Sequence, residues 1–258
     1  MKSIILIKHV SFTIFNEISI INDTPYLLDI DYSNEIHFII MEATPEEKQM
    51  SIGLTTIFSL KGGVGKTALS MAIALEENHN GAKVPVLTND PVSMVHTVMG
   101  KSLTMKLEPK QDFPKQLDEN SDVVLDLGGF VDDRIVGVMG KSRNILIPTF
   151  GDLPSVQATV ATYVEIKNAL PDSVIAIVVN RTDKKDFYDI YNFFRDKCKG
   201  SPVFLVKQSR AFENLYVHKK SIGQMMEENK LLARAYGELH GQLNEIISYL
   251  KGDTDGKV

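Results

Sequence analysis

The sequence predicts an α/β fold in which helices cover both faces of a mostly parallel β-sheet. From residue 53 onward, short apolar runs alternate with longer stretches of helical pattern, and the runs lack the polar alternation of a half-exposed strand. We expect strands over 54–59, 83–88, 122–127, 143–148, 174–180 and 202–206. We expect helices over 66–78, 153–169, 184–197 and 223–250.

The first fifty residues have a different pattern. Two runs rich in Ile, Phe, Tyr and Thr, 3–20 and 26–41, flank the turn-like segment Asn-Asp-Thr-Pro at 22–25, which predicts strands or hairpins. We therefore expect a β-rich acidic extension over 1–50, one α/β domain over 51–252 and a polar tail over 253–258. The sequence allows three interpretations of this extension: a hairpin packed on the sheet of the α/β domain, a docking or regulatory element, or upstream sequence that is not native to the protein.

Composition and charge exclude several classes of protein. The 258 residues include a single cysteine, Cys198, which rules out an internal disulfide or a multi-cysteine metal cluster within one chain and indicates a reducing compartment. No apolar run approaches the roughly 20 residues of a membrane helix, so we expect a cytoplasmic protein. The net charge of −5 belongs to residues 1–50, which carry three basic and eight acidic side chains, and the remainder is neutral.

The loop after the first strand of the α/β region carries the most specific motif. Its sequence is Leu60-Lys61-Gly62-Gly63-Val64-Gly65-Lys66-Thr67. Glycines let backbone N–H groups converge on an anion, and the following helix adds its positive N-terminus. Lys66 can reach the β- and γ-phosphates of a nucleotide, and the Thr67 hydroxyl can bind Mg²⁺. The strict P-loop pattern has glycine where this chain has Leu60, and the alternative is a structural strand–helix turn.

The second lysine of this loop, Lys61, gives the motif a resemblance to the deviant Walker A loop of the ParA/MinD family of ATPases. The resemblance implies a P-loop NTPase fold, ATP and Mg²⁺ as cofactors, and an ATP-dependent homodimer in which Lys61 contacts the partner's nucleotide. It assigns Lys61 and Lys66 to catalysis. The residues implied in ATP binding are Lys61, Gly62, Gly63, Val64, Gly65, Lys66, Thr67 and Ala68. The alternative for Lys61 is a solvated loop lysine.

The next strand ends in Thr88-Asn89-Asp90-Pro91, which is similar to the family's switch I pattern Asp-x-Asp-Pro-Gln. Thr88 replaces the first Asp and Val92 replaces the Gln. By the resemblance, Asp90 is the catalytic carboxylate that orients the attacking water near Mg²⁺. The alternative is turn chemistry, because Asp-Pro commonly begins a turn.

Two further strand ends carry candidate site residues. Asp126 ends the strand at 122–127 and resembles the Walker B carboxylate, which implies a Mg²⁺ ligand, and Gly128 and Gly129 follow it. Asn180 ends the strand at 174–180 and resembles the family residue that contacts the adenine edge. An amide offers both a donor and an acceptor there. The alternative for Asn180 is a side chain that simply ends a strand.

Residues 181–220 carry ten basic and five acidic side chains, a local net charge of +5. Clustered positive charge can bind phosphate backbones without sequence preference. In ParA proteins, similar C-terminal basic residues bind nonspecific DNA once ATP has assembled the dimer. The candidates for DNA contact are Lys184, Lys185, Arg210, Lys219 and Lys220. The alternative is a solvated face of mixed charge.

The resemblance covers roughly 51–250 and is nearest to the short ParA-type plasmid partition proteins, which include ParF. It implies a DNA-partition ATPase with a centromere-binding or other cargo adaptor as partner, slow partner-stimulated hydrolysis, and association with the nucleoid. A conjugation-associated ATPase of the same family remains an alternative. A MinD-like positioning factor would need a basic amphipathic C-terminal helix, and the tail after residue 250 is acidic and polar, so we expect no membrane partner.

Overall fold

The structure is a computed structural model. It describes the backbone of residues 18–21, 24–30 and 36–40, and both backbone and side chains of residues 51–90, 92–108, 111–129 and 132–253. Contacts divide the chain into two compact units, Met1–Gln49 and Met50–Val258. Within the tail predicted over 253–258, residues 254–258 lie outside the described residues.

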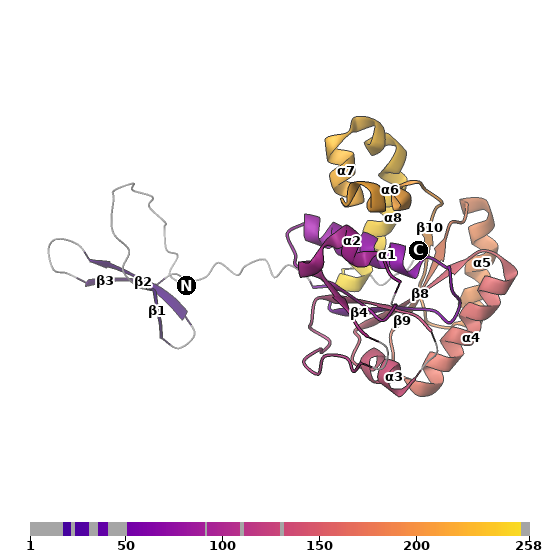
Figure 1. Ribbon diagram of the computed structural model, residues 1–258, viewed down its shortest axis with the longest axis horizontal. Helices are drawn as coiled ribbons and strands as arrows, with labels where there is room; N and C mark the ends of the chain where they lie inside the picture. Colours follow the sequence, from indigo (N-terminus) through magenta and orange to yellow (C-terminus); the bar gives the residue numbers. More distant parts are fainter. Residues whose placement is uncertain are drawn as a thin grey trace. The chain divides into compact units, whose positions relative to one another are not determined.

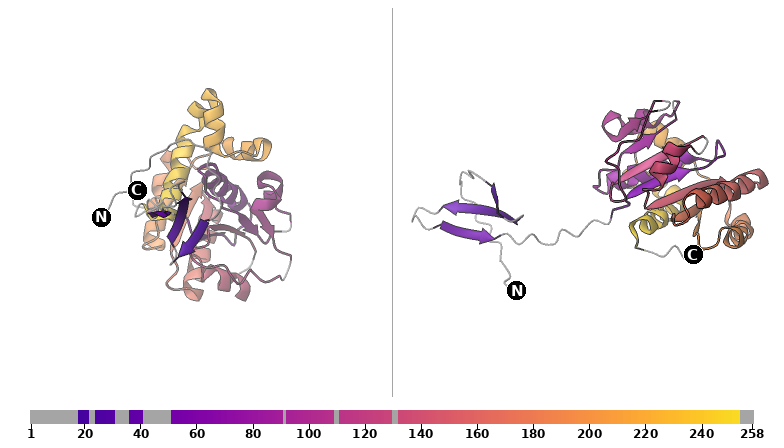
Figure 2. Two further views of the ribbon diagram at one scale, coloured as in Figure 1. Left: turned by 90° about the vertical axis from the view of Figure 1, so that its left-hand side faces the viewer. Right: turned by 90° about the horizontal axis from the view of Figure 1, so that it is seen from below.

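The described part of the first unit is a small antiparallel sheet in the order β1-β2-β3, visible in the right-hand view of Figure 2. Its strands are β1 (Ile18–Ile21), β2 (Thr24–Ile30) and β3 (Ile36–Ile40). β2 begins at Thr24, inside the segment predicted as a turn, because Thr24 and Pro25 pair with Ile21 and Ile20. Most of the predicted run 3–20 lies outside the described residues.

The second unit contains a seven-stranded sheet in the order β10-β9-β8-β4-β7-β5-β6, and every pairing in it is parallel. The strands are β4 (Leu54–Phe58), β5 (Val86–Thr88), β6 (Thr104–Lys106), β7 (Val123–Leu127), β8 (Asn144–Phe150), β9 (Ile175–Asn180) and β10 (Val203–Val206). All five residues of β4 are buried, as expected for a central strand covered on both faces. The predicted fold class is confirmed.

Helices cover both faces of this sheet (Figure 1). On one face, apolar side chains of α1 (Lys66–His79), α2 (Val95–Met99), α6 (Ala211–His218), α7 (Ile222–Glu228) and α8 (Lys230–Lys251) share a core. On the other, α3 (Asp133–Met139), α4 (Leu153–Ala169) and α5 (Lys184–Lys197) form two further clusters with the strands. None of the helices in the described part of the chain has the length and hydropathy that a membrane span requires.

The structure corrects the expected elements in two ways. The helix predicted over 223–250 is two helices, because Asn229 adopts an extended conformation and its side chain caps α8 by accepting from the Leu231 N–H. The short elements α2, α3, α6 and β6, together with a 3₁₀ turn at Lys101–Leu103, were not predicted from the sequence. With three to eight residues each, they are too short for a periodic pattern to show.

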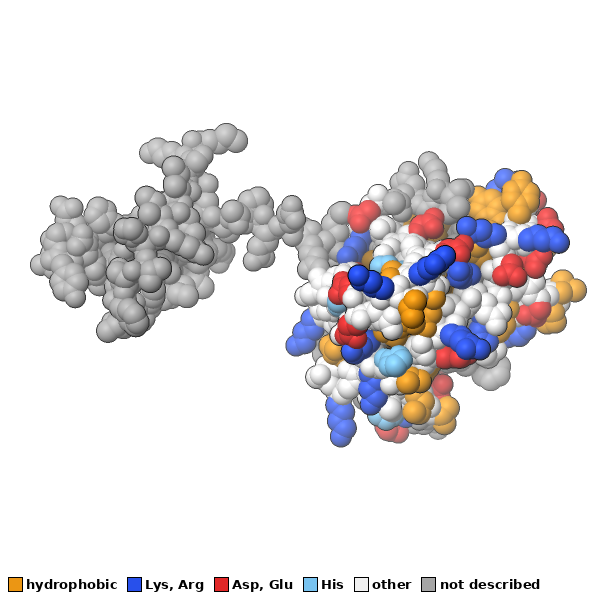
Figure 3. Space-filling view, turned by 90° about the horizontal axis from the view of Figure 1, so that it is seen from above, with side chains coloured by type: hydrophobic (Ala, Val, Ile, Leu, Met, Phe, Trp, Pro, Cys, Tyr) orange, Lys and Arg blue, Asp and Glu red, His pale blue; other side chains and the backbone are white. Residues whose placement is uncertain are grey.

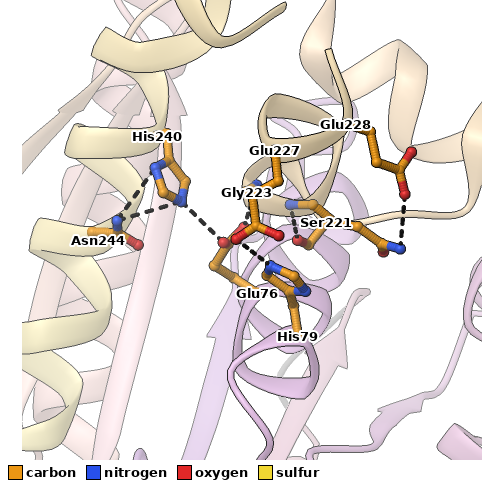
Figure 4. Close-up of polar contacts among 9 residues, drawn as sticks. Glu76, His79, Ser221, Gly223, Glu227, Glu228, His240 and Asn244 are labelled. Atoms are coloured by element: carbon orange, nitrogen blue, oxygen red, sulfur yellow. Dashed lines mark hydrogen bonds and ion pairs between the residues drawn. The ribbon is translucent and has the colours of Figure 1, made fainter. Parts of the chain in front are cut away.

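A buried polar contact joins the last turns of α1 to α7 and α8 (Figure 4). The Glu76 carboxylate, 2% exposed, lies 2.9 Å from His240 Nε2 and accepts a 3.2 Å hydrogen bond from the Gly223 N–H. Burial by itself would raise the pKa of Glu76, but the hydrogen bonds from His240 and Gly223 hold this pKa below its ordinary value. The same hydrogen bond raises the pKa of His240. The helix that begins at the glycine-rich loop is therefore tied at its other end to the C-terminal helices.

Candidate nucleotide-binding site

A cavity of about 610 Å³ opens at the carboxyl ends of the central strands, where ligands bind in open parallel sheets. It is bounded by the loops that follow β4, β5, β7 and β9 and by α6. Its lining residues are Gly62, Gly63, Gly65, Lys66, Thr67, Ala68, Asn89, Asp90, Asp126, Gly128, Gly129, Arg181, Phe212, Glu213 and Tyr216. The structure thus brings most of the predicted loop residues together with Asp90 and Asp126. Lys61, Val64 and Asn180 are not among the residues that line it.

The backbone of the loop between β4 and α1 has the geometry of an anion-binding turn. Gly63 and Gly65 have φ values of 78° and 91°, in the left-handed region that favours glycine. A Cβ on Gly65 would lie 3.0 Å from Asn180 Nδ2, so the loop also packs closely on the end of β9. Val64 is buried, and its carbonyl accepts a 2.9 Å hydrogen bond from Asn180 Nδ2. The structure therefore places Asn180 beneath the loop, where it supports the loop's shape.

Lys66 lies inside this loop at the start of α1. Its Nζ donates to the carbonyls of Ser59, at 3.4 Å, and Lys61, at 3.3 Å. Burial lowers the pKa of Lys66, and the nearby carboxylates of Asp126 and Asp90 act in the opposite direction. A partly desolvated cation beside backbone N–H groups is the arrangement that binds the charged oxygens of a phosphate chain.

Asp126 and Thr67 form the candidate Mg²⁺ site. The Thr67 hydroxyl donates to Asp126 Oδ2 at 2.8 Å, and Thr88, which pairs with Asp126 across the sheet, donates to the same oxygen at 3.4 Å. Burial raises the pKa of Asp126, whereas the hydrogen bond from Thr67 and the charge of Lys66 lower it. Within the described residues there is no group of three or more His, Cys, Asp or Glu side chains that could hold a metal. A hydroxyl and one carboxylate fit Mg²⁺ that is held jointly with nucleotide phosphates.

Asp90 follows β5 and faces the cavity. Its backbone N–H donates to the Thr88 hydroxyl at 3.1 Å, and its Oδ1 accepts from the Val92 N–H at 2.9 Å. The second contact is a local turn, which was the alternative to a catalytic role that the sequence allowed for Asp90. The turn and a place on the cavity wall coexist, because one carboxylate oxygen is held by the backbone and the other makes no hydrogen bond within the described residues.

The Lys61 side chain extends from the glycine-rich loop toward the start of α4. Its Nζ donates to Ser155 Oγ at 2.7 Å and lies 3.3 Å from Asp152 Oδ1, both at the start of α4. Asp152 is the N-cap of α4 and also accepts from the Ser155 N–H and hydroxyl. These contacts, led by the hydrogen bond from Ser155, lower the pKa of Asp152. The lysine is thus bound to the protein surface instead of extending freely into solvent.

Besides Asn89 in the loop after β5, four residues on the cavity wall were not predicted from the sequence: Arg181, Phe212, Glu213 and Tyr216. Arg181 directly follows Asn180 and adopts a φ of 54°, and its guanidinium lies 5.4 Å from the ring centroid of Phe150. The other three belong to α6. Burial, and to a lesser extent the charge of Asp126, raises the pKa of Tyr216. Arg181 could have been predicted as a site residue, because it directly follows a strand of the parallel sheet. The three residues of α6 could not, because only the tertiary fold brings this helix over the cavity.

The candidate DNA-binding residues occupy two places. Lys184 and Lys185 begin α5, and Arg210, Lys219 and Lys220 flank α6. Lys184 Nζ lies 2.9 Å from Glu238 Oε1, and Lys207 forms a 2.6 Å ion pair with the other oxygen of Glu238. Lys220 forms an ion pair with Glu228. On the face shown in Figure 3, Lys and Arg side chains are interspersed with Asp and Glu side chains.

Three solved structures share this architecture at low sequence identity. A complex of McdA with ATP from Cyanothece is 15% identical with a TM-score of 0.57, and the match covers 78% of this chain and 97% of that one. The MinD cell division protein of Aquifex aeolicus is 13% identical at the same TM-score, covering 78% and 98%. MinD of Pyrococcus horikoshii OT3, complexed with Mg-ADP, is 15% identical at 0.54, covering 80% and 99%.

A search of curated proteins finds no significant match. Residues 55–222, more than half of the chain, match the family model described as the CobQ/CobB/MinD/ParA nucleotide binding domain. This range runs from β4 through the phosphate loop, Asp90 and Asp126 to the start of α7. Together with the loop in which Lys61 precedes the glycines, the match shows that the chain belongs to the ParA/MinD family of nucleotide-binding ATPases.

Proposed function

We propose that this chain is a ParA-like DNA-partition ATPase. In the proposed cycle, ATP binding assembles a homodimer that binds DNA without sequence preference. An adaptor protein that carries the cargo then stimulates slow hydrolysis to ADP and phosphate, which returns the protein to its unassembled state.

The observation that carries the proposal is the separation of the two loop lysines. Lys66 contacts the carbonyls of its own loop, whereas Lys61 turns outward to Asp152 and Ser155. The Lys61 side chain is 32% exposed, and its only charged partner among the described residues, Asp152, is 49% exposed. An exposed ion pair of this kind contributes about 0–1 kcal/mol, so it can be exchanged for a phosphate of a second protomer at little cost.

Within one protomer, each residue has a definite task toward ATP. The loop N–H groups and Lys66 bind the phosphates, and Thr67 and Asp126 hold Mg²⁺, which when bound neutralises phosphate charge. Asp90 holds the attacking water through its carboxylate. Lys61 of the partner protomer would add a cation where negative charge develops in the transition state.

The basic residues that remain exposed support the DNA-binding part of the proposal. Within the described residues, Lys185, Arg210 and Lys219 form no ion pair. Phosphate contacts by such side chains give weak, salt-dependent binding in one protomer, and a dimer doubles their number. The alternatives in the same family are a conjugation-associated ATPase and a MinD-like positioning factor.

The decisive experiment measures ATP turnover and self-association of the wild type, Lys66→Ala and Lys61→Ala, each with and without random duplex DNA. We expect the wild type to form an ATP-dependent dimer that is retained on DNA at low salt. Lys66→Ala should lose nucleotide binding, whereas Lys61→Ala should bind ATP and stay monomeric. A wild type that neither turns over ATP nor self-associates with ATP would refute the ATPase cycle.

A second arm separates the partition proposal from the MinD-like alternative. The ATP-bound dimer is offered either random duplex DNA or anionic vesicles of phosphatidylglycerol and phosphatidylcholine. Retention on DNA alone supports the partition proposal, and retention on vesicles alone replaces it with a MinD-like function. Lys101→Ala, a substitution at an exposed lysine outside the cavity, is the control for loss of a single positive charge.

A further inference from the structure

Asn89 connects the loop after β5 with the loop after β7. Its side-chain Nδ2 donates to the Gly128 carbonyl at 3.0 Å, and its Oδ1 accepts from the Gly128 N–H at 2.9 Å. The side-chain amide of Asn89 therefore satisfies both backbone polar groups of Gly128, its N–H and its carbonyl. This pairing also fixes the orientation of the amide, because the flipped rotamer would set donor against donor and acceptor against acceptor.

The two hydrogen bonds continue the pairing of β5 with β7 beyond the last pair of backbone partners. β5 and β7 are parallel neighbours, and their final paired residues are Thr88 and Asp126. Two residues beyond Asp126, the N–H and the carbonyl of Gly128 are both bonded to the Asn89 side chain. The Asn89 side chain therefore replaces a backbone hydrogen-bonding partner at this position. It joins the first residues of the loop after β5 to the first residues of the loop after β7.

Asn89 and Gly128 line the cavity, and so do the residues that follow them. Asp90 follows Asn89, and Gly129, with a φ of 97°, follows Gly128. A Cβ on Gly128 would lie 3.5 Å from Lys66 Cε, so Gly128 is packed against the lysine of the phosphate loop. The Asn89–Gly128 contact therefore sets the separation between the Asp90 carboxylate, the Gly129 backbone and Lys66.

We propose that Asn89 is a positioning residue for ATP hydrolysis, which acts by holding the Asp90 loop and the Gly128–Gly129 loop in fixed register. This inference rests on the proposed ATPase activity and deepens it. Within the described part of the chain, the Asn89 side chain makes no hydrogen bond to the phosphate loop, since both of its polar atoms are bound to Gly128. Loss of the amide should therefore reduce the rate of hydrolysis and leave nucleotide affinity nearly unchanged.

The test compares the wild type, Asn89→Ala, Asn89→Asp and the control Asn120→Ala, which alters an exposed turn residue before β7. We expect kcat of Asn89→Ala to fall about tenfold or more, because small misplacements of reacting groups are costly, while its Kd for a fluorescent ATP analogue stays within about twofold. Asn89→Asp keeps the acceptor for the Gly128 N–H but places a carboxylate against the Gly128 carbonyl, so its kcat should also fall. Asn120→Ala should match the wild type.

Hydrogen exchange provides a readout that does not depend on turnover. In the wild type the Gly128 amide should be protected, and in Asn89→Ala the peptide containing residues 127–129 should exchange faster while β7 itself keeps its protection. A wild-type kcat for Asn89→Ala in an active enzyme would overturn the positioning inference alone. A fall in kcat matched by an equal loss of nucleotide affinity would also overturn it. A wild type without turnover would overturn the proposed ATPase, and this inference with it.

Discussion

The cavity and the basic segment over 181–220 hold their charged side chains in different ways. In the cavity, the ends of neighbouring strands fix the partners of each charge. Lys66 contacts two carbonyls of its own loop. Asp126 on β7 accepts from Thr88 on the adjacent β5 and from Thr67, which follows the other neighbour, β4. Motifs that end adjacent parallel strands are therefore brought together by the register of the sheet.

In the basic segment, the acidic partners belong to α7 and α8, outside the segment itself. Lys184 and Lys207 share Glu238 of α8, and Lys220 pairs with Glu228 of α7. A charge count over 181–220 therefore misses both acids. The comparison teaches that motifs at strand ends predict a site, whereas the net charge of a surface depends on which acids from other helices the fold brings to it.

The largest effect is expected when the cavity loses its central cation. Lys66→Ala should lower kcat/KM for ATP by about 100-fold or more, because one preorganised charge contact to phosphate is worth that factor. Steady-state turnover and nucleotide binding measure it, with Lys101→Ala as the control. An effect no larger than that of the control would show that the cavity does not bind phosphate through Lys66.

Asp126→Asn tests whether the buried carboxylate serves metal binding at the expense of stability. We expect about tenfold more Mg²⁺ to be needed for half-maximal turnover, because a charged oxygen ligand is lost. Burial raises the pKa of Asp126, so the folded state binds this proton more tightly than the unfolded state. The free energy of unfolding of the nucleotide-free wild type should therefore rise as the pH falls through that raised pKa.

The variant lacks this titrating group and should show a flatter profile. Its stability at neutral pH should equal or exceed that of the wild type, because a desolvated charge has been removed while the hydrogen bond from Thr67 remains possible. Denaturant unfolding over a range of pH measures both quantities. A clear loss of stability in Asp126→Asn at neutral pH would show that the Asp126 carboxylate stabilises the fold, and would contradict the view that it serves metal binding at the expense of stability.

The buried contact of Glu76 with His240, which joins α1 to α8 outside both regions, should respond to pH. His240→Gln should lower the free energy of unfolding by about 1.5–3 kcal/mol at pH 6, the usual value for a hydrogen bond to a charged group. The raised pKa of His240 makes its contribution complete below its unfolded value of 6.5, and this contribution is lost as the pH rises through the folded pKa. The lowered pKa of Glu76 makes its contribution complete above 4.5.

The difference between wild type and His240→Gln should thus be largest between pH 4.5 and 6.5 and shrink toward pH 9. His79 and Glu227, which contact each other, lie close enough to act on Glu76 and His240, so each needs its own substitution in the series. His96→Gln, at an exposed position of α2, is the matched control. Equal losses at pH 6 and pH 9 would show that the contact does not depend on ionisation.

The smallest expected effect concerns the surface. Hydrogen bonds from Lys207 and Lys184 lower the pKa of Glu238 to about 2, so this side chain is an anion at every physiological pH. Glu238→Gln frees both lysines and should tighten binding of the ATP-bound protein to random duplex DNA by about threefold at moderate salt. The slope of log K against log salt should steepen by up to about 2, or 0.9 for each added phosphate contact.

Fluorescence anisotropy with labelled duplex DNA measures this change. Glu245→Gln, on the same helix and exposed, removes the same charge without releasing a paired lysine and should change the slope little. If both variants tighten binding equally, the effect is one of net charge, and Lys184 and Lys207 do not contact DNA.

Much of the fold could be predicted because the patterns that specify it are local. The buried strand β9 carries an apolar run over 175–179 without polar alternation, and Gly65-Lys66-Thr67 marks the start of α1. Asn229 shows the limit of such patterns: the residues around it continue a helical periodicity, and only its extended backbone and cap to Leu231 divide α7 from α8.

The candidate site divides in the same way. Sequence by itself determined the phosphate loop, the family, and the strand-end residues Asp90 and Asp126, because glycine, lysine and carboxylate at fixed spacing constrain the local chain. Only the tertiary structure placed Asn180 beneath the loop, brought α6 over the cavity and paired Lys184 with Glu238. Contacts between elements far apart in sequence depend on how helices pack on the sheet, and packing leaves no fixed spacing along the chain that a sequence pattern could reveal.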